Sequence, residues 1–282
     1  RWIFLLLIVN IPDTDLCKTT SSKIRIISLE KRLENFYWIK VERPQNFNFE
    51  SGQFVRISPF EGSIRSAKAN DSWRAQSITS SPTENFLEFL IMFDSKTDFG
   101  KNFVKLEIDS YLNIEVKNYG YLTLNRFENT GDLWLFSTGS GIAPFLSIIK
   151  DLERIDQFDK LIMIHSVWTL KDLSCYEIID STLKKLKKTV YKRSSYLPIV
   201  TREFGKSKLL INGKEFEIDC PSKRIPSLLE SGQLEFLVKC KLSLQKSKIM
   251  ICGNPEMIKQ TRTRLKEMGF KNSRKNSSGQ IA

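Results

Sequence analysis

The chain is poor in the residues that build disulfide frameworks and metal centres. It has five cysteines in 282 residues, an odd number, and none of them forms a CxxC pair. Such scattered cysteines argue against a disulfide framework. With His165 as the only histidine, they also argue against a zinc or iron–sulfur site. Because unpaired thiols persist in reducing compartments, we predict a cytoplasmic protein without a metal site.

Long apolar runs are also scarce. The one extended run, Trp2 to Val9, is shorter than the roughly 20 residues that a membrane-spanning helix needs. No small-residue cleavage pattern of a signal peptide follows it. We therefore expect no stable membrane insertion and treat residues 1–21 as an N-terminal extension of unknown role.

Positive charge is abundant and unevenly distributed. The 44 Lys and Arg residues exceed the 32 Asp and Glu residues, for a net charge of +12. Residues 1–130 hold 17 basic and 16 acidic side chains, whereas residues 131–282 hold 27 and 16. The excess in the second half indicates an anionic partner: nucleic acid, an anionic membrane, a phosphorylated ligand or an acidic protein.

The first part of the chain has the pattern of an antiparallel β structure. Its short segments are rich in β-branched and aromatic residues, partly alternate with polar ones, and are separated by turn residues. This pattern predicts a β-barrel or sandwich. The segments are 23–27, 37–41, 53–57, 89–93 and 112–116, and the polar stretch 61–72 is expected to be a surface loop.

From residue 129 onward, continuous apolar runs alternate with helical patterns. This alternation indicates a parallel sheet covered by helices on both faces. The runs are 133–136, 161–164, 197–200 and 249–252; the helical patterns are 145–154, 172–186 and 255–268. Asn212-Gly213 predicts a hairpin over 209–219. We predict two domains: an antiparallel β-barrel over 22–128, followed by an α/β parallel-sheet domain over 129–282.

Four short motifs carry the chemistry. The glycine-containing turn 138–144 follows the first apolar run, and Pro144 suits the first turn of a helix whose amides attract phosphate. Arg74 and Ser77, in the segment 74–82, could clamp a diphosphate and hydrogen-bond a ligand. Arg202 follows the third apolar run, and Cys252 ends the fourth. Taken singly, the turn 138–144 is as typical of a plain tight turn as of a phosphate site. The other three motifs are more typical of a polar strand, a surface arginine and a packed thiol.

In this order and spacing, the four motifs resemble the bacterial ferredoxin/flavodoxin–NADP reductase family, over residues 22–282. The resemblance implies an FAD-binding barrel and an NADP-binding α/β domain. It implies an NADPH-dependent flavoprotein oxidoreductase that exchanges electrons with an acidic carrier protein, ferredoxin or flavodoxin. It further implies that Ser77 lies near the flavin N5 and that Cys252 lies beside the nicotinamide, as the two catalytic positions.

The resemblance also assigns cofactor-binding positions. For FAD these are Arg74, Gln76, Ser77 and Ile78. For NADP they are Thr138, Gly139, Gly141, Ala143, Pro144, Gly253 and Asn254, with Arg202 and Arg224 holding the 2′-phosphate.

Several positions depart from the family pattern. Gln76 stands where an aromatic residue usually packs on the flavin, which predicts weaker FAD retention or an altered potential. Trp168 replaces a frequent arginine and could either stack on adenine or simply pack. The stretch 97–101 lacks the usual serine-bearing diphosphate loop. Because the chain opens on Arg1 and stops at Ala282, several residues short of its relatives, we expect truncation at both ends.

Three alternatives remain open. One is a flavin or oxygenase reductase component of the same fold. The chain has no CxxxxCxxC pattern, so we expect no appended iron–sulfur domain and a separate molecule as the electron acceptor. Another is a non-catalytic nucleotide-binding module of the same fold. Nucleic-acid binding is the third. The basic residues that prompt it are Lys184, Lys185, Lys187, Lys188, Lys192 and Arg193. Their helical spacing is typical of a solvated face, and no aromatic motif accompanies them, so we expect no nucleic-acid partner. We also expect a monomer.

Overall fold

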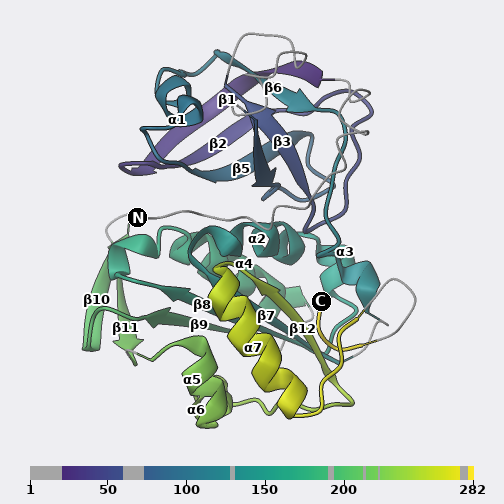
Figure 1. Cartoon of the computed structure of the whole chain (residues 1–282), viewed down its shortest axis with the longest axis vertical. Coiled ribbons are helices and arrows are strands. Elements are labelled where there is room, and N and C mark those ends of the chain that lie inside the picture. Colours follow the sequence, from purple (N-terminus) through teal and green to yellow (C-terminus); the bar gives the residue numbers. More distant parts are fainter. Residues whose placement is uncertain are drawn as a thin grey trace. The chain divides into compact units, whose positions relative to one another are not determined.

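The structure is a computed structural model that describes residues 21–59, 73–127, 131–189, 194–211, 214–221, 223–273 and 279–282. It divides into two compact units (Figure 1). The first runs to Thr123 and includes Ala143–Asp151; the second comprises Leu124–Ile142 and Leu152–Ala282. The predicted loop 61–72 and all but Ser21 of the predicted N-terminal extension lie outside the described residues. The domain ranges 22–128 and 129–282 stay a prediction, and the units differ from them most at residues 143–151.

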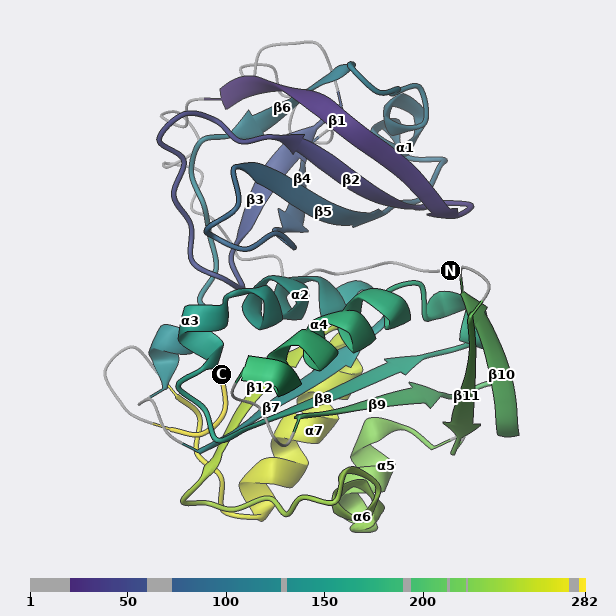
Figure 2. The ribbon, with the colours of Figure 1, turned by 180° about the vertical axis from the view of Figure 1, so that it is seen from behind.

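The first unit is built on six antiparallel strands in the order β4-β3-β6-β1-β2-β5 (Figure 2). A bridge between Ile78 and Phe89 joins the two edges of this sheet, which makes a nearly closed barrel. The strands are β1 (Ser21–Leu33), β2 (Phe36–Glu42), β3 (Phe54–Ser58), β4 (Arg74–Ser77), β5 (Phe86–Met92) and β6 (Tyr111–Glu115). The predicted antiparallel β-barrel is confirmed.

Alternation along the strands fills the barrel with apolar side chains. Residues such as Ile24, Ile39 and Ile57 are at most 2% exposed. The short helix α1 (Asp98–Phe103) adds the buried rings of Phe99 and Phe103 to the same core. Its first turn is closed by the Gly100 amide, which donates to the Thr97 hydroxyl at 3.1 Å.

Helix α2 (Ala143–Lys150) packs with the first unit although it follows a strand of the second. The Ser147 hydroxyl donates to the Ser80 carbonyl at 2.7 Å, and Lys150 Nζ lies 2.6 Å from the buried Glu88 carboxylate. The single helix expected over 145–154 is wrong. Helix α2 ends before Asp151, whose carboxylate accepts a 2.7 Å hydrogen bond from the Ser51 hydroxyl. A separate short helix, α3 (Leu152–Ile155), follows.

The second unit contains a four-stranded parallel sheet in the order β12-β7-β8-β9. Helices α5, α6 and α7 cover one face and α4 covers the other (Figures 1 and 2). The predicted parallel α/β architecture is confirmed. The strands are β7 (Asp132–Thr138), β8 (Lys160–Val167), β9 (Ser194–Val200) and β12 (Ser247–Cys252); the helices are α4 (Tyr176–Thr189), α5 (Ile225–Glu230), α6 (Gln233–Val238) and α7 (Pro255–Glu267).

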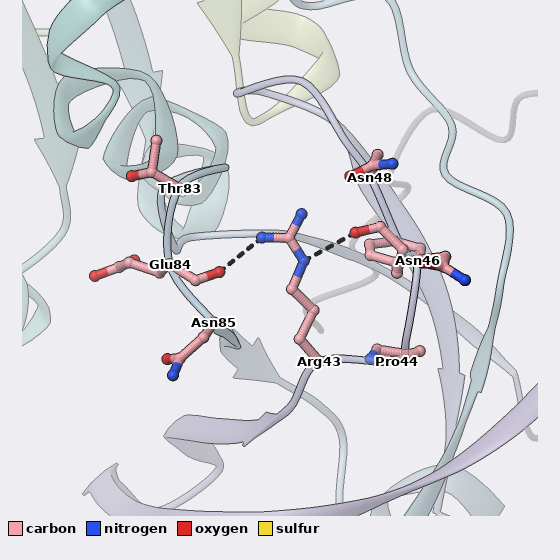
Figure 3. Close-up of a pocket in the computed structure, with 8 residues that line it drawn as sticks. Arg43, Pro44, Asn46, Asn48, Thr83, Glu84 and Asn85 are labelled. Atoms are coloured by element: carbon pink, nitrogen blue, oxygen red, sulfur yellow. Dashed lines mark hydrogen bonds between the residues drawn. The ribbon is translucent and has the colours of Figure 1, made fainter.

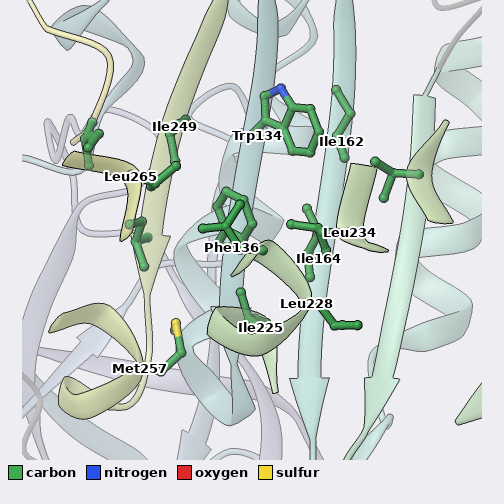
Figure 4. Packing of buried hydrophobic residues seen from close by; sticks show 14 of the residues in the cluster. Trp134, Phe136, Ile162, Ile164, Ile225, Leu228, Leu234, Ile249, Met257 and Leu265 are labelled. Atoms are coloured by element: carbon green, nitrogen blue, oxygen red, sulfur yellow. The ribbon is translucent and has the colours of Figure 1, made fainter. Parts of the chain in front are cut away.

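Alternate residues of each central strand point to the face that α5, α6 and α7 cover. Trp134 and Phe136 of β7 pack there with Ile162 and Ile164 of β8 and Ile249 of β12 (Figure 4). The residues between them are equally buried on the other side. This two-sided burial explains why these strands appear in the sequence as continuous apolar runs.

An antiparallel hairpin, β10 (Gly205–Ile211) and β11 (Lys214–Cys220), extends from the sheet after β9. It is longer than the predicted 209–219, because polar residues continue the pairing to Gly205 and Cys220. Leu209 and Ile218 pack it onto Val167 and Val200. Among the described residues, no helix is long and apolar enough to cross a membrane.

Candidate nucleotide-binding site

The carboxyl ends of β7 and β12 meet at the predicted glycine-containing turn. The two strands are parallel neighbours, with Cys252 opposite Ser137. The Asn254 amide donates to the Thr138 hydroxyl oxygen at 2.7 Å. The Asn254 side chain accepts from the Glu256 amide at 2.9 Å, which caps the thirteen-residue helix α7. Asn254, which follows β12, therefore connects the turn after β7 to the start of α7.

Two glycines let these loops approach closely. A Cβ atom on Gly141 would lie 2.5 Å from the Gly253 Cα and 2.6 Å from the Cys252 carbonyl oxygen. A Cβ atom on Gly253 would lie 2.1 Å from the Thr138 hydroxyl oxygen, and Gly253 has a φ of +134°. Neither position accommodates a side chain. Gly141 and Gly253 therefore lie in contact. Their predicted role in cofactor binding stays a prediction.

The turn after β7 rests on His165, a residue to which the sequence analysis gave no role. Its side chain is 1% exposed, and Nε2 lies 2.9 Å from the carbonyl oxygen of Gly139. Because a carbonyl only accepts, Nε2 carries the proton, and Nδ1 accepts from the Tyr196 hydroxyl at 3.2 Å. Burial lowers the pKa of His165 to about 4. A single histidine directly after an apolar run was the available signal.

Cys252 ends β12 at the same edge of the sheet. Burial raises the pKa of its thiol to about 12. The side chain therefore stays protonated at neutral pH and is suited to contact rather than to nucleophilic attack. Its predicted place beside a nicotinamide is untested by this geometry.

Arg202 and Trp168 face each other at the ends of β9 and β8. The Arg202 amide donates to the Trp168 carbonyl at 2.9 Å, and the guanidinium carbon lies 3.5 Å from the centre of the indole. Arg224 is the exposed residue before α5. Ala143 and Pro144 are buried at the start of α2, which belongs to the first unit. The contacts thus bring Arg202 to Trp168, a pairing that the sequence did not predict.

The predicted FAD positions lie together on the first unit. Arg74, Gln76 and Ser77 belong to β4, and Ile78 follows it. Alternation places Arg74 and Gln76 on one face of the strand and Ser77 on the other. Gln76 is 8% exposed and Ile78 is fully buried. The Arg74 guanidinium carbon lies 5.9 Å from the centre of the Phe99 ring, which belongs to α1.

A separate open pocket of about 440 Å³ in the first unit contains none of these residues (Figure 3). Arg43 crosses it and donates to the carbonyls of Phe47 at 2.8 Å, Pro82 at 2.7 Å and Glu84 at 2.6 Å. Its donors join two loops of the barrel. We therefore regard this pocket as a structural feature rather than as the site.

Known proteins match this chain over most of its length. The family model described as an oxidoreductase NAD-binding domain matches residues 135–263. A flavodoxin/ferredoxin–NADP reductase of Buchnera aphidicola subsp. Schizaphis graminum is 30% identical over 216 residues, or 76% of this chain and 78% of the relative. A second, from Buchnera aphidicola subsp. Baizongia pistaciae, is 29% identical over 92% of this chain and 95% of the relative.

A solved structure agrees with these relatives. The ferredoxin NADP+ reductase of Neisseria gonorrhoeae, whose crystal structure holds FAD and NADP, superposes with a TM-score of 0.78 at 29% identity. The match covers 94% of this chain and 98% of that protein. The resemblance predicted from the four motifs is confirmed: the chain belongs to the flavodoxin/ferredoxin–NADP reductase family.

Proposed function

We propose that the protein is an FAD-dependent oxidoreductase that moves electrons between NADPH and a one-electron carrier protein, a ferredoxin or a flavodoxin. Family membership supports this proposal, together with the Neisseria relative that binds both FAD and NADP. The observation that carries it is the close packing of Gly141 and Gly253 at the carboxyl ends of two parallel strands. Such strand ends form the ligand crevice of open α/β sheets.

On this proposal, the second unit binds NADP. Gly139, which has a φ of +52°, and Gly141 leave the turn backbone open to a pyrophosphate. Thr138, Gly253 and Asn254 hold that turn through the contacts described above. In the second unit, Arg202 and Arg224 are proposed for the 2′-phosphate. Ala143 and Pro144, at the start of α2 in the first unit, are the remaining proposed NADP residues.

The first unit binds FAD on the same proposal. Arg74 supplies positive charge for the diphosphate, and Gln76, Ser77 and Ile78 contact the flavin. FAD, when bound, supplies the conversion between two-electron and one-electron transfer. Ser77 and Cys252 are proposed to lie beside the reacting atoms, where the uncharged Cys252 thiol orients the nicotinamide without attacking it.

An absorption spectrum of the purified chain tests the activity. We expect flavin bands, their bleaching by NADPH, and steady reduction of ferricyanide. Flavin-loaded protein that neither bleaches nor reduces ferricyanide would support a non-catalytic module instead. Because Gln76 offers little stacking area, we also expect FAD to be lost on repeated gel filtration. A flavin-to-protein ratio that stays at one contradicts that second expectation.

Arg202→Ala is expected to lower the preference for NADPH over NADH by about 10- to 100-fold in kcat/KM. The reason is that a charge-assisted hydrogen bond to phosphate contributes about 1.5–3 kcal/mol. NADH, which lacks the 2′-phosphate, should be used nearly as well as before. Lys266→Ala, which removes an exposed positive charge at the far end of α7, is the matched control. An unchanged ratio in Arg202→Ala contradicts the assignment.

Three further properties are proposed with the function. The excess positive charge of residues 131–282 attracts an acidic carrier, and association that weakens with added salt tests this. A reducing, cytoplasmic setting is consistent with the four described cysteines, which are free. The monomeric state stays a prediction, to be checked by light scattering.

A further inference from the structure

The loops that follow β8 and β9 are joined along their backbones. The Thr201 amide donates to the Val167 carbonyl at 3.0 Å, and the Arg202 amide donates to the Trp168 carbonyl at 2.9 Å. The Glu203 carboxylate reaches across and accepts from the Leu170 amide at 2.9 Å. These bonds extend the β8–β9 pairing beyond the strands. They place Trp168 and Arg202 side by side on one rigid edge.

The two side chains then stack. At 3.5 Å from the centre of the indole, the Arg202 guanidinium carbon is at van der Waals contact with the ring, well inside the roughly 6 Å limit for cation–π attraction. The N–H groups of a guanidinium stacked in this way lie in a plane parallel to the ring and are not directed at it. Trp168 is 36% exposed and Arg202 is exposed, so an anion can reach those N–H groups.

No carboxylate neutralises this arginine within the part of the chain that the structure describes. The adjacent acid, Glu203, is engaged by the Leu170 amide, and the ion pairs of the described residues do not include Arg202. Arg202 is therefore an exposed, oriented cation whose stacking contact is apolar. An arginine held this way loses less side-chain entropy on binding an anion than a freely rotating one.

We propose that Trp168 is a specificity-determining residue that acts through Arg202. Its indole holds the guanidinium in the orientation that donates to the 2′-phosphate of NADP. The indole makes no essential contact with the adenine. This inference rests on the proposed function and adds to it the device that selects the phosphorylated nucleotide. It differs from stacking of Trp168 on adenine, because stacking would favour phosphorylated and unphosphorylated nucleotides equally.

Calorimetric titration of the full-length holoenzyme with 2′,5′-ADP and with 5′-AMP separates the two roles. Trp168→Leu is expected to weaken 2′,5′-ADP binding about 5- to 10-fold, the range expected for loss of a cation–π contact at a partly exposed site. Binding of 5′-AMP should change less than about twofold. Trp168→Phe keeps an aromatic face and should recover most of the loss, which a role in packing alone does not predict.

A double-mutant cycle supplies the control. Because Trp168 acts through Arg202, Trp168→Leu should cause no further loss of 2′,5′-ADP affinity in an Arg202→Ala background. Equal losses for both nucleotides would show adenine stacking, and unchanged affinities in the folded variants would show simple packing; either result overturns the proposal. Should Trp168→Leu not fold, Trp168→Gln, which likewise removes the aromatic face, takes its place in the cycle with Arg202→Ala. A wild-type protein that binds neither nucleotide would instead contradict the proposed function.

Discussion

Gly253→Ala is expected to lower the stability of the second unit by about 3 kcal/mol, equivalent to a fall of roughly 10 °C in its unfolding midpoint. The new Cβ would lie 2.1 Å from the Thr138 hydroxyl oxygen and 2.8 Å from both its backbone nitrogen and its carbonyl oxygen. Backbone atoms cannot move aside as a flexible side chain can. The loop after β12 must therefore separate from the turn after β7, or Gly253 must leave its φ of +134°.

The same substitution should weaken binding of 2′,5′-ADP by at least about tenfold, because it displaces the turn that Asn254 holds against Thr138. Thermal unfolding followed by circular dichroism, together with calorimetric titration, measures both effects. Gly205→Ala is the matched control: its φ is +74°, and no atom lies within 4 Å of the added Cβ. It should cost only about 1 kcal/mol of backbone strain. Equal effects of the two substitutions would falsify the rigid packing of these loops.

Acidification is expected to destabilise the second unit through His165. Its pKa is about 4 in the folded protein because burial disfavours the charged imidazolium, against 6.5 for the exposed side chain. Between pH 6.5 and pH 4 the unfolded chain binds a proton that the folded chain does not. The stability contributed by neutral His165 is therefore complete above about pH 7 and declines as the pH falls, by about 2 kcal/mol at pH 5 and about 3 kcal/mol below pH 4.

The measurement is the change in urea-unfolding free energy between pH 7.5 and pH 5 for the wild type and for His165→Gln. Glutamine does not titrate, so the variant should lose about 2 kcal/mol less over this interval. Groups such as Glu115, whose pKa is raised by burial in the first unit, act in the opposite direction and cancel in the comparison. Because His165 is the only histidine, its imidazole resonances also report the titration directly. Titration near pH 6.5 in the folded protein contradicts the expectation.

Loss of neutral His165 should also affect the candidate site. Its Nε2 proton is donated to the Gly139 carbonyl, and its Nδ1 accepts from Tyr196, whose own pKa burial raises well above 10. Protonation of Nδ1 would turn it from an acceptor into a donor, so the Tyr196 hydroxyl would have to rotate and accept. The turn that the proposed function assigns to the pyrophosphate should therefore loosen in acid together with the core beneath it.

The sequence by itself determined the architecture. Alternation around Ile39 and Ile57 and continuous burial around Leu135 and Ile164 are periodic signals that depend only on nearby residues, and such signals predicted the barrel and the parallel sheet. The order of the four motifs predicted the family. The turns that contain Gly141 and Gly253 were predictable as strand-to-helix junctions, because such a junction is also a local feature.

Only the tertiary structure decided which distant groups act together. Gly139 and His165 are 26 residues apart, and Trp168 and Arg202 come from the ends of different strands. Helix α2 follows β7 in the chain, yet Lys150 and Ser147 bind it to the barrel through Glu88 and Ser80. Periodicity carries no information about such partners. Strand register brings these groups together. Buried donors and charges need partners, and only the folded chain supplies those partners.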